Sequence, residues 1–211
     1  MPVVLLVRHG QASFGADDYD VLSDLGREQS VVVGQELARR ALRSPVAVCG
    51  SLRRQRATAE IALPAVLLAV DARWDEYDHL SLLQRYVPGD PTHDGTSKGV
   101  QGLLDQALAA WVDDPSGGWG AFSGGAADAL TDLAGRLDRG QDAVVFTSGG
   151  IVAAVTAALL GLGASGVVAV NRVTANGAIT KVVLGGSGTS LVSFNDHAHF
   201  EGEARRLLTY R

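Results

Sequence analysis

The sequence is poor in cysteine, in basic residues and in long apolar runs. Its one cysteine, Cys49, cannot form a disulfide within the chain, which excludes the class of small disulfide-rich secreted proteins. The apolar runs at residues 1–7 and 151–162 are too short to cross a bilayer, and no basic segment precedes the first. We therefore expect a cytoplasmic protein that does not contact a membrane.

Acidic residues outnumber basic ones. The chain has 18 Lys and Arg residues against 23 Asp and Glu residues, a formal net charge of −5, and no Lys/Arg cluster outweighs this balance. Such a charge argues against a nucleic-acid partner. The 211 residues, 46% of them apolar, are enough to bury a large core. We expect one domain over residues 1–211 and leave the oligomeric state open, a homodimer included.

Short apolar runs alternate with helical patterns in the first third of the chain. Val3–Val7 and Val46–Cys49 are typical of strands buried on both faces of a parallel sheet. A helix is expected from the N-cap residue Ser23 to about Arg43, and another over about Leu52–Leu63. This β-α-β-α order predicts a three-layer α/β/α sandwich with a mostly parallel central sheet.

The same alternation returns late in the chain. The expected elements are the strand Ala143–Thr147, the helix Ile151–Leu160 closed by Gly161, and the strands Val167–Val173, Ala178–Leu184 and Ser190–Phe194. The region between the halves, at about 84–125, is less regular and is expected to hold one helix near residues 100–112. Its glycine-rich part fits a lid or a surface loop. Four aromatic residues there either line a pocket or, as we favour, anchor the region to the core: Tyr86, Trp111, Trp119 and Phe122.

The first strand leads directly into Arg8, His9 and Gly10. Ligands of α/β proteins collect at the carboxyl ends of the strands. A histidine there can attack phosphorus through a neutral ring nitrogen, and the forked guanidinium of an arginine can hold two phosphoryl oxygens. On its own, the tripeptide fits equally well an arginine paired with an acidic side chain and a histidine at a turn.

A second cluster, Ser51–Glu60, follows the second strand and contributes Arg54. Together the two clusters resemble the motifs of the histidine phosphatase superfamily, the phosphoglycerate mutase-like proteins. The resemblance implies that His9 is the phosphorylated nucleophile and that Arg8 and Arg54 bind phosphate. It extends to Leu22–Gln29, Trp74–Glu76, Phe146–Ile151, Asn176–Thr180 and Asn195–Phe200. The segment at about 84–125 matches poorly and is expected to be a variable insertion.

The resemblance also implies a two-step mechanism on a small phosphorylated substrate, without a metal or another cofactor. Glu76 is the candidate proton donor, first as an acid toward the leaving group and then as a base toward water. Its pKa must be raised by burial or by its acidic neighbours Asp75 and Asp78. Either neighbour is an alternative donor, and Glu76 also fits an exposed polar loop.

One departure from the family concerns the turn after the late strand. Ser148 stands where the family carries a second histidine, so a donor remains and a charge is lost. Ser148 and the following Gly149 are expected to contact the phosphoryl group. We hypothesise that His79, close after Glu76, fills the space of the missing histidine.

A second departure lies in the loop after His9. Phe14 and Gly15 stand where the family carries Trp and Asn, so Gln11 and Ser13 are expected to supply part of the phosphate contacts. The leading interpretation is phosphomonoester hydrolysis. The alternatives are phosphotransfer of the phosphoglycerate mutase type, or a phospholigand-binding protein that has lost turnover because of Ser148.

Three other patterns in the sequence resemble functional motifs but are interpreted as structural features. The glycines of residues 161–166 match a dinucleotide-binding string but follow a helix instead of a strand, so we expect a helix cap and turn. Ser148 lacks the glycine that a serine hydrolase needs two residues before the nucleophile. His197 and His199 fit half of a metal site, but a structural role is favoured because no further ligands are near in sequence.

Overall fold

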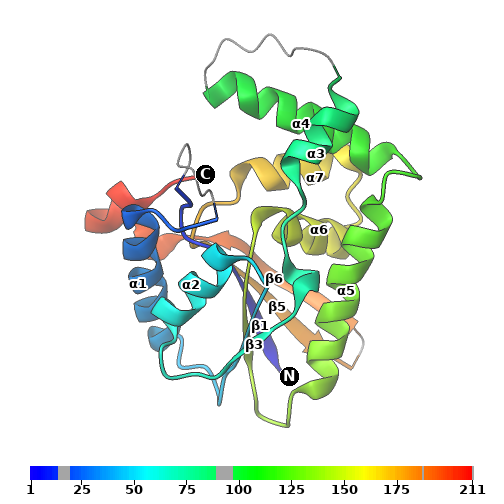
Figure 1. Ribbon diagram of the computed structural model, residues 1–211. Helices are drawn as coiled ribbons and strands as arrows, with labels where there is room; N and C mark the ends of the chain where they lie inside the picture. The colour runs from blue at the N-terminus through cyan, green and yellow to red at the C-terminus, as the bar shows by residue number, and fades with distance from the viewer. Residues whose placement is uncertain (14–19, 89–96, 187, 211) are drawn as a thin grey trace.

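The computed structural model describes residues 1–13, 20–88, 97–186 and 188–210 and contains a six-stranded mixed sheet (Figure 1). The strand order is β3-β2-β4-β1-β5-β6. Neighbours among β3, β2, β4 and β1 are parallel, and β5 runs antiparallel to both of its neighbours. The strands are β1 (Val3–Arg8), β2 (Val46–Cys49), β3 (Leu68–Val70), β4 (Ala143–Thr147), β5 (Ile179–Gly185) and β6 (Gly188–Asp196).

Helices cover both faces of the sheet, which confirms the three-layer α/β fold. Val4 and Leu6 of β1 pack on one face against α5 (Trp119–Arg136) and α6 (Gly149–Leu160). Leu5 and Val7 point to the other face, toward α1 (Asp24–Arg39) and α2 (Arg53–Ala62). A strand buried on both faces needs an unbroken apolar run, and the sequence of β1 supplies one. In Figure 1, α1 and α2 lie to one side of the sheet and α5 to the other.

The caps of the helices follow local chemistry. The Ser23 hydroxyl accepts a hydrogen bond of 3.1 Å from the Gly26 N–H, which confirms Ser23 as the N-cap of α1. The helix ends at Arg39, earlier than the expected Arg43, because Ala41 adopts a left-handed backbone with φ of 48°. Gly161, with φ of 64°, closes α6 as expected.

The prediction of a strand over residues 167–173 is wrong. This segment belongs to helix α7 (Ala164–Val173). Its β-branched residues favour a strand, but Val167 and Val168 are buried against α4 and α6, and packing decides the structure. The glycines of residues 161–166 therefore connect two helices.

The prediction of an irregular region at 84–125 is also largely wrong. The expected helix is present as α4 (Ser97–Asp113), the end of α3 (His79–Tyr86) lies at the start of the region, and the first turns of α5 lie at its end. Helix α5 was not predicted because its glycines have low helix propensity. Three of them, at 120, 124 and 125, face open space. Burial of Ala126 and Ala129 against the core stabilises α5 and offsets the weak helix propensity of its glycines. Residues 89–96 lie outside the described part of the chain.

The aromatic side chains of this region anchor it to the core. The ring centroid of Trp111 lies 5.1 Å from that of Trp119 and 5.3 Å from that of Phe122. Trp111 is also 5.5 Å from Tyr77, in the segment that follows β3, and only 7% of it is exposed. Helices α3, α4 and α7 thereby form a helical cap beside the carboxyl ends of the parallel strands (Figure 1).

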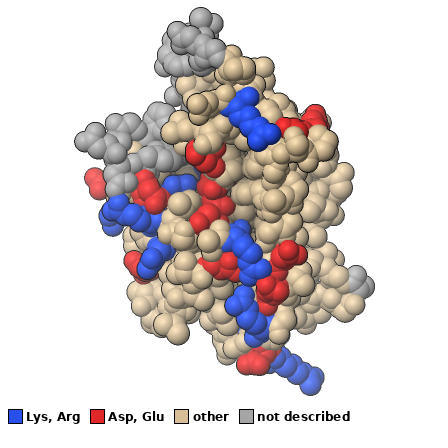
Figure 2. All heavy atoms as spheres, turned by 45° about the vertical axis from the view of Figure 1, so that its right-hand side comes forward, with Lys and Arg blue, Asp and Glu red and all other residues tan. Residues whose placement is uncertain are grey.

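The remaining elements are short. The 3-10 turn η1 (Ala72–Trp74) follows β3, and η2 (Ala198–Phe200) and η3 (Gly202–Leu207) follow β6. No helix in the described ranges is long and apolar enough to cross a membrane. The face shown in Figure 2 carries acidic and basic side chains next to one another.

Candidate active site

The pairing of two strands brings the first site residues together. Arg8, the last residue of β1, lies opposite Thr147, the last residue of β4. The His9 N–H then donates a hydrogen bond of 2.8 Å to the Thr147 carbonyl oxygen. His9 and Ser148 consequently leave neighbouring strand ends at the same edge of the sheet, as the sequence predicts.

The loop after His9 lies unusually close to α1. A Cβ at Gly10 would lie 2.3 Å from the carbonyl oxygen of Gly26, and a Cβ at Gly26 would lie 2.1 Å from that of Gln11. The two glycines are needed for this close approach, and neither has a positive φ. Since the Gly10 N–H also donates a hydrogen bond of 3.0 Å to Thr58 Oγ1, the turn that positions His9 is held from two helices.

The His9 ring is 4% exposed and is held in one tautomer. Its Nδ1 lies 2.6 Å from the Gly10 carbonyl oxygen, which can only accept a hydrogen bond, so Nδ1 carries the proton. Its Nε2 accepts a hydrogen bond of 3.2 Å from Arg54 Nε. Burial, followed by the charges of Arg54 and Arg8, holds the pKa of His9 well below that of an ordinary histidine. The ring is therefore neutral at physiological pH, with its lone pair on Nε2.

Two arginines lie around this ring. Arg54, in the first turn of α2, is 7% exposed and pairs through Nη1 with Asp20 Oδ1 at 2.7 Å. The other oxygen of Asp20 accepts a hydrogen bond from the Arg53 N–H at 2.8 Å, at the N-terminus of the same helix. Arg8 donates through Nη1 to the carbonyl oxygens of Thr174 and of Tyr210, the latter at 3.1 Å. Both guanidinium groups are thus held in fixed positions by protein oxygens.

Glu76 lies close enough to Arg8 and Arg54 for both charges to act on it. Both of its carboxylate oxygens are 3.1 Å from the N–H of Gly150, in the first turn of α6. Burial raises the pKa of Glu76, although the Gly150 hydrogen bond and the charges of Arg8 and Arg54 oppose the change. The same two arginines influence His9, which places the carboxyl group and the imidazole around one cationic centre.

The two acidic neighbours of Glu76 have structural contacts instead. Asp75 accepts hydrogen bonds from the N–H and the hydroxyl of Ser51, at 2.5 and 2.6 Å. Asp78 caps α3 through the N–H groups of Leu80 and Ser81. Of the two expected causes, burial is the one that raises the pKa of Glu76, and Asp75 and Asp78 are not needed for it.

Ser148 is fully buried at the N-terminus of α6. Its Oγ accepts a hydrogen bond of 2.8 Å from Gln55 Nε2, so its own proton is left for another acceptor. A Cβ at the following residue, Gly149, would lie 3.5 Å from Arg8 Nε, so this turn borders the guanidinium of Arg8. The turn, the two arginines, the imidazole and the carboxyl group form one cluster, in which His9, Arg54 and Ser148 are buried and Arg8 and Glu76 are half-buried.

A profile of the histidine phosphatase superfamily (branch 1) matches residues 4–197, which include every member of this cluster. The chain belongs to the histidine phosphatase superfamily. The glucosyl-3-phosphoglycerate phosphatase of Mycolicibacterium vanbaalenii is a relative that is 29% identical over 188 residues, covering 75% of this chain and 74% of the relative.

Solved structures of other phosphatases share the fold. A mycobacterial glucosyl-3-phosphoglycerate phosphatase in complex with inorganic phosphate is similar with a TM-score of 0.67 at 23% identity, over 94% of this chain and 99% of that one. The phosphoserine phosphatase of Entamoeba histolytica in complex with 3-phosphoglyceric acid gives the same TM-score at 18% identity, over the same shares of the two chains. At these identities the likeness concerns the fold alone.

The remaining residues that the superfamily motifs suggested lie nearby with other partners. Gln11 Oε1 accepts a hydrogen bond of 3.0 Å from the Ser23 hydroxyl, which ties this side chain to the start of α1. Ser13 pairs through its backbone N–H with Val21. The departures at Phe14 and Gly15 lie outside the described residues.

His79 is the first residue of α3 and is half-buried. Burial lowers its pKa, the Asp78 carboxylate opposes this, and the charge of Arg54 adds to the lowering. This histidine therefore lies within electrostatic reach of a phosphate-binding candidate, on the helical cap above the strand ends.

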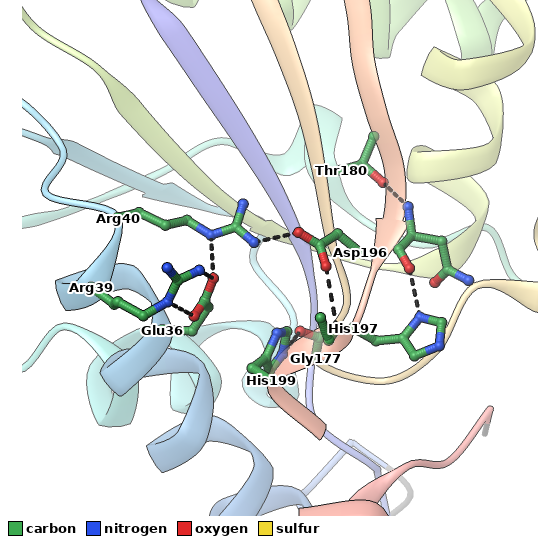
Figure 3. A network of polar contacts seen from close by, with 10 residues as sticks. Glu36, Arg39, Arg40, Gly177, Thr180, Asp196, His197 and His199 are labelled. Carbon is green, nitrogen blue, oxygen red and sulfur yellow. Dashed lines mark hydrogen bonds and ion pairs between the residues drawn. The ribbon is translucent and has the colours of Figure 1, made fainter. Parts of the chain in front are cut away.

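His197 and His199 contact two different carbonyl oxygens at the C-terminal end of β6 (Figure 3). His197 Nδ1 lies 2.6 Å from the oxygen of Asn195, and His199 Nε2 lies 3.1 Å from that of Gly177. No group of three or more His, Cys, Asp and Glu side chains within the described ranges is arranged to hold a metal ion. Gly177 in turn donates its N–H to the Arg8 carbonyl oxygen at 3.0 Å, so His199 supports the end of β1.

Sequence reasoning missed three residues of this site. Asp20 pairs with Arg54, Gln55 binds Ser148, and Asn176 donates an amide hydrogen bond of 3.2 Å to the His9 carbonyl oxygen. The signal for Gln55 was a polar residue next to Arg54 on the buried face of α2. Asp20 pairs across a distance in sequence that no pattern reveals.

Gly150 and Gly149 supply a matched pair of variants. A Cβ at residue 150 would lie 2.1 Å from Glu76 Oε1, whereas a Cβ at residue 149 makes only ordinary contacts of 3.4 Å or more. We expect Gly150→Ala to displace the carboxyl group and reduce hydrolysis of an alkyl phosphate by about 10²-fold, the scale of a lost general acid. Gly149→Ala keeps the backbone N–H through which a glycine can contact a phosphoryl group and adds a Cβ only at ordinary contact distances, so it should change the rate far less. Equal rates for the two variants would contradict this placement of Glu76.

Proposed function

We propose that this protein is a phosphomonoester hydrolase that acts through a phosphohistidine intermediate on His9. The observation that carries the proposal is the state of the His9 ring, which is neutral, protonated at Nδ1 and directed through Nε2 at Arg54. A neutral ring nitrogen beside the buried guanidinium of Arg54 and the half-buried one of Arg8 is suited to attack a phosphoryl group, whose negative charge the arginines balance.

The first step transfers the phosphoryl group to the protein. His9 Nε2 forms a bond to phosphorus while the bond to the alcohol oxygen breaks, and the electron pair of that bond stays on the leaving oxygen. Glu76, whose pKa is raised by burial, donates a proton to this oxygen. Arg8 and Arg54 bind the phosphoryl oxygens, and Ser148 and Gly149 with Gln11 and Ser13 complete the phosphate contacts.

The second step releases phosphate. A water molecule attacks phosphorus, the Glu76 carboxylate accepts its proton, and the electron pair of the N–P bond returns to His9 Nε2. The two steps regenerate His9 and the protonated Glu76 and need no metal or other cofactor. We prefer hydrolysis to phosphotransfer between substrates because the relatives found by sequence and by structure include phosphatases for two different phosphomonoesters.

The substrate is proposed to be a small phosphorylated molecule of the cytoplasm. The helical cap of α3, α4 and α7 lies beside the strand ends that carry His9 and Ser148, so we assign substrate selection to it. Helix α4 and the end of α3 lie in the segment at about 84–125, which we expect to vary within the family.

His9→Ala tests the nucleophile. Because the variant lacks the nitrogen that receives the phosphoryl group, turnover of p-nitrophenyl phosphate should fall by about 10⁴-fold or more. Acid-labile phosphate should label the wild-type protein and not the variant when the reaction is quenched early. If neither protein turns over phosphomonoesters, yet inorganic phosphate raises the thermal midpoint of both, the protein is a phospholigand-binding protein instead.

The pH profile tests Glu76. The donor must be protonated. Because its pKa is raised, activity should persist at pH values above the pKa of an ordinary glutamate and be lost as the pH rises through the raised pKa. His9 must be neutral, and its lowered pKa places the acidic limb below that of an ordinary histidine. We expect Glu76→Gln to remove the basic limb and to reduce hydrolysis of alkyl phosphates by about 10²–10⁴-fold.

The leaving group supplies the control for this variant. p-Nitrophenolate needs little protonation, so Glu76→Gln should affect p-nitrophenyl phosphate much less than an alkyl phosphate. An equal loss on both substrates would show that Glu76 has another role.

His79 is proposed to add a donor to the phosphoryl group in place of the second histidine. His79→Ala should then reduce kcat/KM by about 10- to 100-fold, the scale of a hydrogen bond to a charged group. Leu80→Ala, on the same helical turn and 66% exposed, is the matched control and should behave as the wild type. Unchanged activity in His79→Ala would remove His79 from the site.

A further inference from the structure

Gln55 connects three chain segments at the base of the site. It follows Arg54 on α2, and none of it is exposed. Its Nε2 donates one hydrogen bond of 3.0 Å to the Trp74 carbonyl oxygen and another of 2.8 Å to Ser148 Oγ. One amide group thereby joins α2 to the segment before Glu76 and to the turn between β4 and α6.

Both hydrogen bonds lead to the proton donor. Trp74 lies two residues before Glu76, and Ser148 lies two residues before Gly150, whose N–H binds both oxygens of Glu76 at 3.1 Å. The Gln55 amide and the Gly150 N–H therefore close a ring of contacts around the carboxyl group. The adjacent Arg54 contacts the nucleophile, so the same turn of α2 sets the distance between nucleophile and acid.

The other half of the amide argues against a space-filling role. Gln55 Oε1 is buried and accepts no hydrogen bond from the described residues. An unsatisfied buried acceptor is unfavourable, and an apolar side chain of the same size would avoid that cost. A Cβ at Gly50 would lie 2.0 Å from this oxygen, which shows how closely the backbone packs around it. The two donated hydrogen bonds are what distinguishes glutamine from leucine here.

The Trp74 carbonyl oxygen does not depend on Gln55 for a hydrogen bond. Thr147 Oγ1 donates to the same oxygen at 2.7 Å, so this acceptor keeps a partner when Gln55 is replaced. The contribution of Gln55 is thus the connection itself, between the nucleophile side and the acid side of the site.

We propose that Gln55 is a positioning residue for the phosphoryl transfer, which holds Ser148 and the segment of Glu76 in a fixed place relative to Arg54. This role rests on the function proposed above. With the amide in place, Ser148 Oγ has one lone pair occupied and its proton free to be donated to a phosphoryl oxygen. Without the amide, the hydroxyl can rotate and Glu76 gains access to water.

The experiment compares Gln55→Leu with the wild type on an alkyl phosphate across pH 5–8. We expect kcat to fall by up to about 10²-fold, the cost of a displacement of about 1 Å at a reacting group. KM should change little, because Arg8 and Arg54 still bind the phosphoryl group. The basic limb of the pH profile should move to lower pH, because a hydrated Glu76 has a lower pKa.

Four further variants make the test specific. Gln55→Glu keeps the size of the side chain, but its carboxylate cannot donate to Ser148, so it should show the same loss of kcat if Gln55→Leu does not fold. Ser148→Ala is measured alone and combined with Gln55→Leu. The loss of kcat in the double variant should be smaller than the product of the losses in the two single variants. Leu133→Ala, in the core on α5, should lower the thermal midpoint and leave kcat and the pH profile unchanged.

The outcomes separate the two proposals. If Gln55→Leu behaves as Leu133→Ala does, with a lower thermal midpoint but wild-type kcat and pH profile, Gln55 has only a structural role. Losses that multiply in the double variant would also overturn the inference. If the wild-type protein turns over no phosphomonoester, the proposed function fails, and the role of Gln55 fails with it.

Discussion

The parallel pairing of β1 with β4 is the constraint on which the rest of the site depends. It places Arg8 opposite Thr147 and joins the His9 N–H to the Thr147 carbonyl oxygen. Because side chains alternate along a strand, a shift of one residue would turn every buried side chain of β1 to the wrong face. The two core clusters, one on each face, therefore fix the register, and the register brings His9 and Ser148 to one edge of the sheet.

The charged side chains at this edge of the sheet favour the binding of an anion. Arg8 and Arg54 are held by carbonyl oxygens and by Asp20, and burial together with their charges keeps the pKa of His9 low. Burial of Glu76 acts in the opposite direction to those charges and raises its pKa. The neutral nucleophile and the protonated acid that the proposed mechanism requires are thus obtained beside one cationic centre, because burial disfavours the charged form of both groups.

Much of this arrangement is predictable from the sequence, and the exceptions have physical reasons. The runs Val46–Cys49 and Ala143–Thr147 match strands β2 and β4 without error, since a fully buried strand needs a continuous apolar run. Helices α5 and α7 were missed because their glycines and valines have low helix propensity, which packing overrides. His9, Arg8, Arg54 and Glu76 do come together. The partners Asp20 and Gln55 were not foreseen, because their contacts depend on how segments distant in sequence meet.

The serine at the family's second histidine position is best understood together with Gln55. A histidine at residue 148 would add a third cationic donor, and serine leaves the balance of the phosphoryl charge to Arg8 and Arg54. What remains necessary is a donor in the correct place, and a hydroxyl that rotates freely is poorly suited to that task. A buried amide 2.8 Å away removes this freedom. The substitution at residue 148 therefore changes the charge of the site while its geometry is retained by a neighbour on a different helix.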